Sequence, residues 1–427
     1  MKITLPSDYG DRELVIPDGI DIEVLSPQAV RIPPRTQVVI NSALSSPLGT
    51  LPLEQLVHQQ KKNGHGMICI ICEDMTRHSP TNVIMPMILD RLNDGGVPDG
   101  DIFVVMALGT HRPMTKDEIR MKVGEEVCNR VAVYNSKFHD KNKLVHLGSH
   151  ADYPLWLDRR VAEADIRIGV GSVMPHPVAG WSGGAKIVIP GVTGEKTVRS
   201  FHLSTHKFRE NMFGREITPS RELMERLVRK IGLDFVVNSV YTPEGEVYAV
   251  LCGDFIQAQR AAVKRAQEVY CAPAKRKAQL VISNSYPADL DFWQAGKALH
   301  SGDIVAEDGG EIVLVSSCPE GLGPHSSLPD LFERAIQDRA QLLRDTQSGK
   351  VADVIAASSA LMRTRTIMSR KRLGLVSEHL DRKTMERLGF TVYKSMEHML
   401  EKNLTESGTK IRVSVLTHGG STLPLLS

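Results

Sequence analysis

The sequence predicts an α/β protein of two α/β domains with a cleft between them, in which the N-terminal domain is the larger and the C-terminal domain is Rossmann-like. The chain has 427 residues, more than one ordinary hydrophobic core accommodates. Predicted strands and helices alternate along it, the order that builds largely parallel sheets. Between residues 269 and 279 an expected amphipathic helix (256–270) gives way to Ala, Pro and Lys. We therefore place the N-terminal domain at 1–270 and the C-terminal domain at 277–427, and we allow the last strand or helix to pack back on the first domain.

The individual elements follow from hydrophobic period and from their boundary residues. The first 60 residues are rich in Pro and polar side chains and predict short strands and turns. Beyond them, Thr115 and Glu118 form a capping-box pattern that marks the start of one helix. In the first domain the expected strands are 66–73, 101–109, 131–135 and 164–171, and the expected helices are 80–96 and 115–131. In the second domain, strands at 278–285, 310–317 and 409–420 alternate with helices at 289–302 and 328–345.

Composition narrows the classes of function. The formal net charge is +2, from 52 basic and 50 acidic side chains, so no basic surface suited to nucleic acid is expected. No run of about 18 apolar residues occurs, so no membrane span is expected. The N-terminus lacks the apolar region of a signal peptide, and six cysteines in a chain of this length do not suggest a disulfide framework. We therefore expect a cytoplasmic protein.

Cys69 and Cys72 form a Cys-x-x-Cys pattern within an expected strand. Residues i and i+3 of a strand face opposite sides, whereas a redox pair normally opens a helix. The pattern therefore predicts two thiols packed in the core.

Polar clusters follow three of the expected strands at the points where these strands end. In open α/β sheets, ligands bind beyond the carboxyl ends of the strands, so these loops are expected to converge on one crevice. The loops carry Asp74, Thr76 and Arg77, then His111 and Arg112, then His176 and Lys186.

Two histidines in one crevice are suited to acid/base chemistry on the two faces of one carbon, as inversion of a stereocentre requires. His111 and His176 are the candidates, and for each a packing or capping role is the alternative. Arg77 has a planar fork suited to a carboxylate or phosphate, and a surface ion pair with Asp74 is its alternative.

The segment "HPVAGWSGGAK" ends at Lys186. It fails the phosphate-loop pattern, because Ala185 precedes the lysine and Ile187 follows it. Its glycines, among them Gly183 and Gly184 beside Ser182, still let backbone N–H groups approach an anion. A lysine that enters an apolar strand is either a nucleophile or attachment point with a lowered pKa, or a side chain that reaches the surface.

Two further pairs lie one helical turn apart. His202 and His206 share a face of an expected helix and suit a metal, but no third protein ligand has a recognisable spacing. Gln294 and Lys297 share a face of the first helix of the second domain. Capture of a substrate carboxylate and an exposed helix face are both open for this pair.

Taken together, these residues resemble the nickel-pincer lactate racemase family of 2-hydroxy-acid racemases and epimerases. The resemblance rests on an ordered set of motifs and extends from about residue 60 to at least 310. The motifs are "DMTR" (74–77), "GTHRP" (109–113), "HPVAGWSGGAK" (176–186), the histidine at 202 and "FWQAGK" (292–297).

The resemblance implies a nickel-pincer nucleotide, a pyridinium mononucleotide with two sulfur-bearing arms that carries nickel. It implies that Lys186 is joined to one arm, that His202 is the protein ligand of nickel, and that His206 is a bystander. By the same carry-over, Asp74, Thr76, Ser182, Gly183 and Gly184 contact the cofactor, with Asp74 and Thr76 at the phosphate or orienting Arg77.

The resemblance also assigns the chemistry. His111 and His176 are the implied acid/base pair, while Arg77, Gln294 and Lys297 hold the substrate and the planar 2-oxo acid formed when hydride passes to the cofactor. The implied partners are a small 2-hydroxy acid and the proteins that synthesise the cofactor, and homo-oligomerisation is left open.

The sequence departs from the family pattern near the implied substrate pocket. Trp181 stands where Phe is usual, and Phe292 and Trp293 precede Gln294 where Tyr is typical. If these side chains line the pocket, larger aromatic or sugar-type acids are as credible as lactate. Two other functions stay open, namely a zinc-dependent hydrolase or lyase that uses His202 and His206, and a nucleotide- or anion-binding protein without catalysis.

Overall fold

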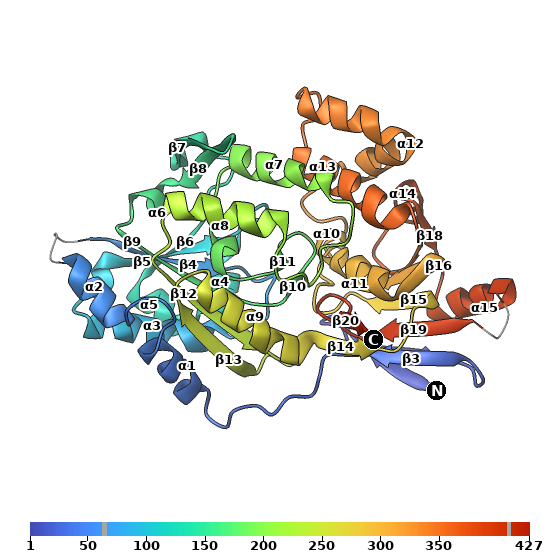
Figure 1. Ribbon diagram of the computed structural model, residues 1–427, viewed down its shortest axis with the longest axis horizontal. Helices are drawn as coiled ribbons and strands as arrows, with labels where there is room; N and C mark the ends of the chain where they lie inside the picture. The colour runs from blue at the N-terminus through green and yellow to red at the C-terminus, as the bar shows by residue number, and fades with distance from the viewer. Residues whose placement is uncertain (62–65, 408–410) are drawn as a thin grey trace.

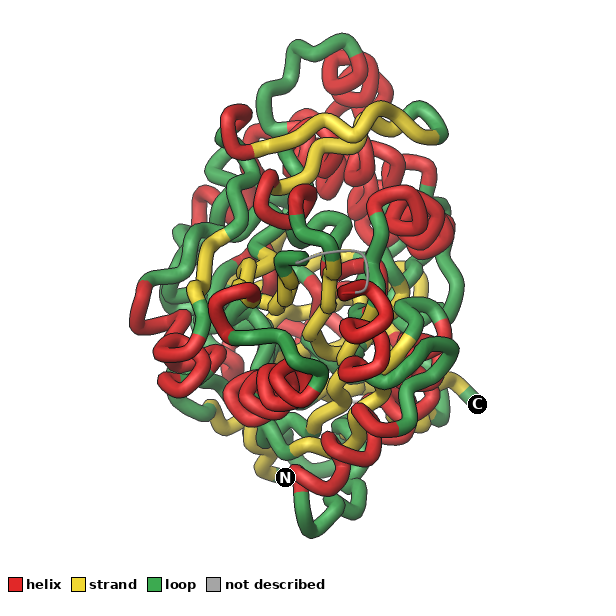
Figure 2. Tube along the Cα trace, turned by 90° about the vertical axis from the view of Figure 1, so that its left-hand side faces the viewer, coloured by secondary structure: helices red, strands yellow, loops and turns green. Residues whose placement is uncertain are grey.

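The computed structural model describes residues 1–61, 66–407 and 411–427. It has two six-stranded sheets, each flanked by helices, and the two α/β units lie side by side (Figure 1). The strands in the middle of the molecule are surrounded by helices, while a strand hairpin lies at the surface, as Figure 2 shows. The predicted fold class, two α/β domains with a cleft between them, is therefore confirmed.

The first sheet has the strand order of a doubly wound fold. Its strands are parallel except for the last one at one edge, which is antiparallel to its neighbour. From β4 the chain adds β5 and β6 on one side and β9 and β12 on the other, so the strand order reverses between β4 and β9. In such sheets ligands bind in the crevice at this point. The order across the sheet is β13 (Val247–Gly253), β12 (Phe235–Tyr241), β9 (Ile166–Ser172), β4 (Ile68–Glu73), β5 (Ile102–Ala107), β6 (Ala132–Asn135).

All strands of the second sheet are parallel, and the order of the strands along the chain reverses between β15 and β19. Residues 409 and 410 of the predicted last strand lie outside the described residues, and the rest of it forms β19 and the turn that follows. The order across this sheet is β18 (Phe390–Val392), β17 (Arg372–Val376), β16 (Ala306–Val315), β15 (Ala278–Asn284), β19 (Arg412–Leu416), β3 (Asp21–Leu25).

The edge strand β3 corrects the predicted domain assignment. The assignment of residues 1–270 to one domain placed this strand with the first sheet, but β3 pairs in parallel with β19 of the second sheet. The hairpin of β1 (Lys2–Leu5) and β2 (Arg12–Val15) packs beside it and buries Leu5 and Leu14 against that sheet. The cause is long-range pairing, because β3 covers the edge of β19, which would otherwise be unpaired.

The C-terminal strand lies where the two domains meet. β20 (Leu423–Leu426) pairs in parallel with β14 (Cys271–Ala274), the segment that leads from the first domain into the second.

Helices pack on both faces of each sheet, and several boundaries differ from the predicted ones. Two helices within the first 60 residues were not predicted, because proline-containing stretches flank them and no side chain caps the first. The capping box of Thr115 and Glu118 is confirmed, but Gly124 (φ 92°) divides the predicted helix 115–131 in two. In the first domain the helices are α1 (Thr36–Ser45), α2 (Leu53–Lys61), α3 (Thr81–Asp94), α4 (Lys116–Val123), α5 (Glu125–Arg130), α6 (Arg159–Glu163), α7 (Glu195–Ser204), α8 (Pro219–Ile231) and α9 (Gln257–Tyr270). In the second they are α10 (Phe292–Ala295), α11 (Lys297–Val305), α12 (Leu328–Gln347), α13 (Val354–Arg363), α14 (Arg382–Arg387) and α15 (Met396–Ser407).

Cys69 and Cys72 lie on opposite faces of β4 in two different hydrophobic clusters, and both are fully buried and unpaired. The prediction of two core thiols is confirmed. Burial raises the pKa of both thiols, which keeps them protonated and unreactive.

No helix among the described ranges is both long enough and apolar enough to cross a membrane.

Candidate active site

A single cavity between the two domains collects all of the predicted site residues. Its empty space of about 1360 Å³ includes the part that opens to solvent. Its first wall comes from the loops after β4, β5 and β9, at the reversal of the first sheet, and its second wall comes from α10, α11 and α13. The predicted residues that line it are Asp74, Thr76, Arg77, His111, His176, Ser182, Gly183, Gly184, Lys186, His202, Gln294 and Lys297.

His111 is held by a carboxylate. The turn after β5 is closed by a hydrogen bond from the backbone N–H of His111 to the carbonyl of Leu108 at 2.9 Å, and the Nδ1 atom of His111 lies 2.5 Å from Oδ2 of Asp74. Burial by itself would raise the pKa of Asp74, but His111 and the hydroxyl of Thr76 outweigh it and hold the pKa well below its usual value. An ionised carboxylate only accepts hydrogen bonds, so the Nδ1 atom of His111 donates to it.

The acceptor nitrogen of His111 connects the two domains. The side-chain amide of Gln294 donates to Nε2 of His111 at 2.8 Å, and its carbonyl oxygen accepts from Nζ of Lys297 at 2.5 Å. Gln294 ends up beside Lys297 although Gly296 separates their two helices. Asp74 was predicted at the cofactor phosphate or on Arg77, and its observed partners are His111 and Thr76. Arg77 donates instead to the carbonyl and hydroxyl oxygens of Thr76, at 2.8 and 3.0 Å.

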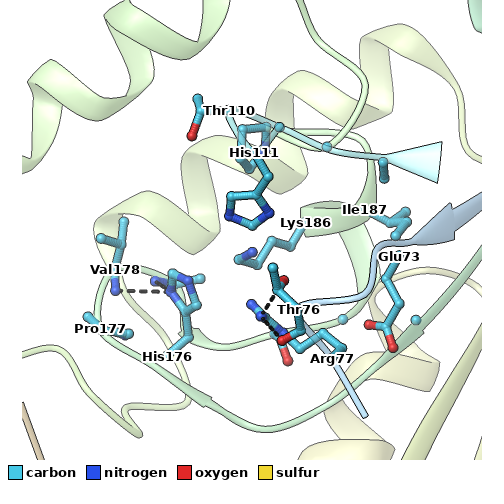
Figure 3. Close-up of a pocket in the computed structure, with 18 of the residues that line it drawn as sticks. Glu73, Thr76, Arg77, Thr110, His111, His176, Pro177, Val178, Lys186 and Ile187 are labelled. Atoms are coloured by element: carbon cyan, nitrogen blue, oxygen red, sulfur yellow. Dashed lines mark hydrogen bonds between the residues drawn. The ribbon is translucent and has the colours of Figure 1, made fainter. Parts of the chain in front are cut away.

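His176 adopts the opposite tautomer. It lies in the short hairpin of β10 (Pro175–His176) and β11 (Gly180–Trp181), and its Nδ1 atom accepts from the backbone N–H groups of Val178 and Ala179, both at 3.2 Å. Burial, then the charges of Lys186 and Lys297, hold the pKa of His176 well below its usual value. The neutral ring therefore carries its proton on Nε2. Figure 3 shows His111, His176 and Lys186 directed toward one another.

Lys186 does not enter a strand as predicted. It lies in a 3-10 helix, η3 (Gly184–Ile187), because Gly183 and Gly184 take positive φ angles of 77° and 57°. A Cβ atom on Gly184 would lie 2.5 Å from the carbonyl oxygen of Phe255, so the turn packs more tightly than any side chain permits.

Buried side chains from neighbouring elements fix this glycine turn. Arg221 of α8 donates to the carbonyl oxygens of Trp181 and Gly183, and Oδ1 of Asn238 accepts from the N–H of Gly184 at 3.0 Å. The hydroxyl of Ser182 donates to Ser172 and accepts from Met174. The hydroxyl of Ser182 and the N–H of Gly184 thus already have hydrogen-bond partners within the chain, which the sequence pattern did not reveal.

Burial, then the charges of Arg77 and Arg221, lower the pKa of Lys186 to about 7. A large fraction of the amine is therefore neutral near neutral pH, which is the form that attacks an electrophile.

His202 and His206 separate in the structure. His202 of α7 lines the cavity, and burial lowers its pKa to about 3, so the imidazole is neutral and able to bind a metal. His206 belongs to the next 3-10 turn, and its Nδ1 atom is bonded to the carbonyl oxygen of Leu203. The described residues contain no group of three or more His, Cys, Asp or Glu side chains that could hold a metal ion.

Trp181 is a core residue and not a pocket residue, which corrects the expectation that it lines the substrate pocket. Its side chain is fully buried, and its indole N–H donates to the carbonyl oxygen of Gly214 at 2.7 Å. The departure from the family pattern that does reach the cavity is Trp293.

We expect Trp181→Phe to lower the free energy of unfolding by about 1–3 kcal/mol, because it leaves the Gly214 carbonyl unsatisfied and a small void. Denaturant unfolding measures this loss. The ratio of kcat/KM between any two acids should stay unchanged. A changed ratio at unaltered stability would show that Trp181 lines the substrate pocket.

Several cavity residues were missed because no motif marks them. Asn238 lies in the middle of β12, a strand that was not predicted, and its Nδ2 atom is buried without a hydrogen-bond partner among the described residues. His300, Ser359 and Arg363 come from the second domain, where the sequence carries little diagnostic signal beyond Lys297. An unpaired buried arginine is visible only in three dimensions.

Comparison with known proteins agrees with the motifs. The profile of the lactate racemase N-terminal domain matches residues 8–213, and that of the lactate racemase C-terminal domain matches residues 274–423. A lactate racemase from Lactiplantibacillus plantarum is 26% identical over 390 residues, which cover 90% of this chain and 89% of the relative. A lactate racemase from Thermoanaerobacterium thermosaccharolyticum is 28% identical over 296 residues, 67% of this chain and 66% of the relative.

Solved structures show the same fold. The lactate racemase apoprotein from Thermoanaerobacterium thermosaccharolyticum superposes with a TM-score of 0.87 at 22% identity, covering 100% of both chains. A protein from Thermotoga maritima superposes with a TM-score of 0.67 at 18% identity, covering 88% of this chain and 98% of the other. With both domain profiles matched along most of its length, the chain belongs to the lactate racemase family and is an isomerase.

Proposed function

We propose that the protein racemises or epimerises a 2-hydroxy acid, either lactate or a larger acid, with a nickel-pincer nucleotide attached to Lys186. One observation carries the proposal: Lys186, His202 and two histidines that are protonated on opposite ring nitrogens lie in one interdomain cavity. Each has a separate task in inversion by hydride transfer, whereas a binding protein without catalysis has no use for the arrangement.

The donor set fits a metal that brings most of its own ligands. His202 contributes one neutral imidazole, and the described residues form no cluster of protein ligands around it. This also disfavours a zinc hydrolase or lyase built on His202 and His206. Lys186 has a nucleophilic amine, and the Nδ2 atom of Asn238 is a spare donor for a nucleotide. When bound, the group supplies a hydride acceptor for the α-carbon of the substrate.

The residues of the chain then divide the work. Arg77 and Lys297 bind the substrate carboxylate and retain the 2-oxo acid. Burial, then the charge of Arg77, lower the pKa of Lys297 well below its usual value, and the incoming carboxylate favours its charged form. The substrate hydroxyl replaces the amide of Gln294 at Nε2 of His111, since both need the same lone pair. His111 takes the hydroxyl proton, and the carboxylate of Asp74 stabilises the resulting imidazolium.

His176 faces the opposite side of the substrate with a hydrogen-bond donor. Complete transfer of its Nε2 proton requires Nδ1 to leave the two backbone N–H groups and to gain a proton. Until then, His176 holds the substrate oxygen in place.

A screen of 2-hydroxy acids in heavy water, followed by chiral separation, tests the function. The protein is produced together with the proteins that synthesise the cofactor, as the proposal requires, and in the proposed cytoplasmic setting. We expect inversion with the α-hydrogen largely retained, together with nickel and an adduct on Lys186 in the intact mass. His206→Ala is the matched control and should keep its nickel. Absence of both nickel and adduct, or full exchange of the α-hydrogen, contradicts the proposal.

A further inference from the structure

One wall of the cavity carries a buried arginine for which the described residues provide no carboxylate. Arg363, the last residue of α13, lines the cavity and is only 7% exposed. Its Nε atom has no hydrogen-bond partner, and within residues 1–61, 66–407 and 411–427 no carboxylate pairs with its guanidinium. Burial alone lowers its pKa to about 10. An unpaired buried charge is costly, so a partner from outside the chain is expected.

Arg221 makes the contrast clear. It is also fully buried and its Nε atom also lacks a hydrogen-bond partner, but its two Nη atoms donate to the carbonyl oxygens of Gly183 and Trp181, and Nε lies 3.9 Å from a carboxylate oxygen of Glu225. The chain thus supplies carbonyl oxygens and a carboxylate to a buried arginine that has a structural role. Among the described residues, Arg363 has neither kind of partner.

The surroundings of Arg363 have the form of a binding site. Ser359 lies one helical turn earlier on α13 and lines the same cavity. A Cβ atom on Gly296 would lie 2.1 Å from Nη2 of Arg363 and 2.5 Å from its Cζ. Gly296 has an ordinary helical φ of −56°, so a side chain there would not strain the backbone but would displace the guanidinium of Arg363. The glycine between Gln294 and Lys297 therefore seats the guanidinium beside the predicted substrate residues.

His300 adds an acceptor to this wall. Its Nδ1 atom lies 3.3 Å from Oδ1 of Asn211, and its Nε2 atom is buried without a partner. Burial, and after it the charge of Arg363, lower the pKa of His300 well below its usual value. The ring is neutral, with its proton on Nδ1, so Nε2 accepts a hydrogen bond from a hydroxyl next to an anion.

We propose that Arg363, together with Ser359, binds an oxyanion, which is either a phosphoryl group or a second carboxylate. The guanidinium fork matches both groups and the hydroxyl of Ser359 adds a donor, while Nε2 of His300 accepts from a hydroxyl beside the anion. Two sources have this chemistry: the phosphate of a pyridinium mononucleotide, and the far end of a substrate larger than lactate. The inference rests on the proposed function only for the choice between these sources.

Inorganic phosphate is the first probe, titrated into the protein produced without cofactor synthesis and followed by calorimetry and by thermal unfolding. We expect phosphate to raise the Tm of the parent protein, and Arg363→Gln to weaken phosphate binding about 10-fold or more. In phosphate-free buffer the variant should be at least as stable as the parent, since an unpaired buried charge is removed.

Arg339→Gln is the matched control. Arg339 donates to the carbonyl oxygens of Leu361 and His206 close to α13 but does not line the cavity. This variant should keep the phosphate affinity. A phosphate affinity unchanged by Arg363→Gln, or a Tm that falls in that variant without phosphate, overturns the proposal in favour of a purely structural arginine.

Two ligand pairs then identify the source. If the oxyanion belongs to the cofactor, nicotinic acid mononucleotide binds more tightly than nicotinic acid riboside, and Arg363→Gln removes the difference. If it belongs to the substrate, 3-phosphoglycerate binds more tightly than glycerate, with the same dependence on Arg363. If Arg363→Gln changes neither difference, the proposal fails. None of these measurements needs catalysis, so they stand or fall separately from the proposed racemisation.

Discussion

Lys186→Arg is expected to reduce racemisation at least about 10³-fold while the protein stays folded. The pKa of Lys186 is lowered to about 7, so its amine is a nucleophile near neutral pH, whereas a guanidinium remains protonated and forms no comparable bond. Chiral separation of the product gives the rate, and intact mass reports the adduct. Residual activity within about tenfold of the parent, with the adduct absent, would show that attachment at Lys186 is not required.

The same lowered pKa has a direct chemical signature. In the protein without cofactor, acylation of Lys186 should rise with pH around a midpoint near 7, because the reactive neutral amine accumulates as pH passes the pKa of the folded state. Exposed lysines, with pKa values near about 10.4, provide the internal control. Peptide mapping after brief exposure to an acylating reagent measures both. A midpoint shared with the exposed lysines would contradict the burial argument.

Asp74→Asn is expected to lower kcat by about 10²–10⁴-fold and to change KM much less. The carboxylate holds the proton of His111 on Nδ1 and stabilises the imidazolium, and an amide does neither reliably. Asp74 stays ionised across the neutral range, since its pKa is held well below the usual value, so the parent should show no loss of activity from its protonation near pH 6.

Asp99→Asn is the matched control for this substitution. Asp99 also has a lowered pKa, caused by Arg130, but it lies outside the cavity. Its replacement should leave kcat unchanged. If Asp74→Asn raised KM and left kcat intact, Asp74 would serve in binding and not in orienting His111.

The site was predictable from the sequence where strand ends, chain order and motifs coincide. His111, His176 and Lys186 each follow a buried apolar run, and parallel strands bring such positions to one edge of a sheet. The partners of these residues were not predictable to the same degree. Asp74 was expected near phosphate or Arg77. Its hydrogen bond to His111 depends on how the loops after β4 and β5 are placed relative to each other.

Elements whose position depends on distant packing escaped prediction. Nothing local distinguishes Trp181 as a core residue, because its partner Gly214 is 33 positions away. The strand β3 has a short apolar pattern that suits either sheet, and only pairing with β19 decides. Arg363 carries no motif, and its importance comes from the absence of a carboxylate near it among the described residues.

The position of β3 has a mechanical consequence. Because β3 belongs to the second sheet and α1 to the first unit, the chain passes between the units at residues 26–35 and again at 271–277. The first passage contacts the end of α9, just before the second passage begins, since the N–H of Gln28 donates to the carbonyl oxygen of Val269 at 2.7 Å. We expect two neighbouring connections to restrict the relative motion of the two units more than a single linker would, and so to favour the contact of Gln294 with His111 across the cleft.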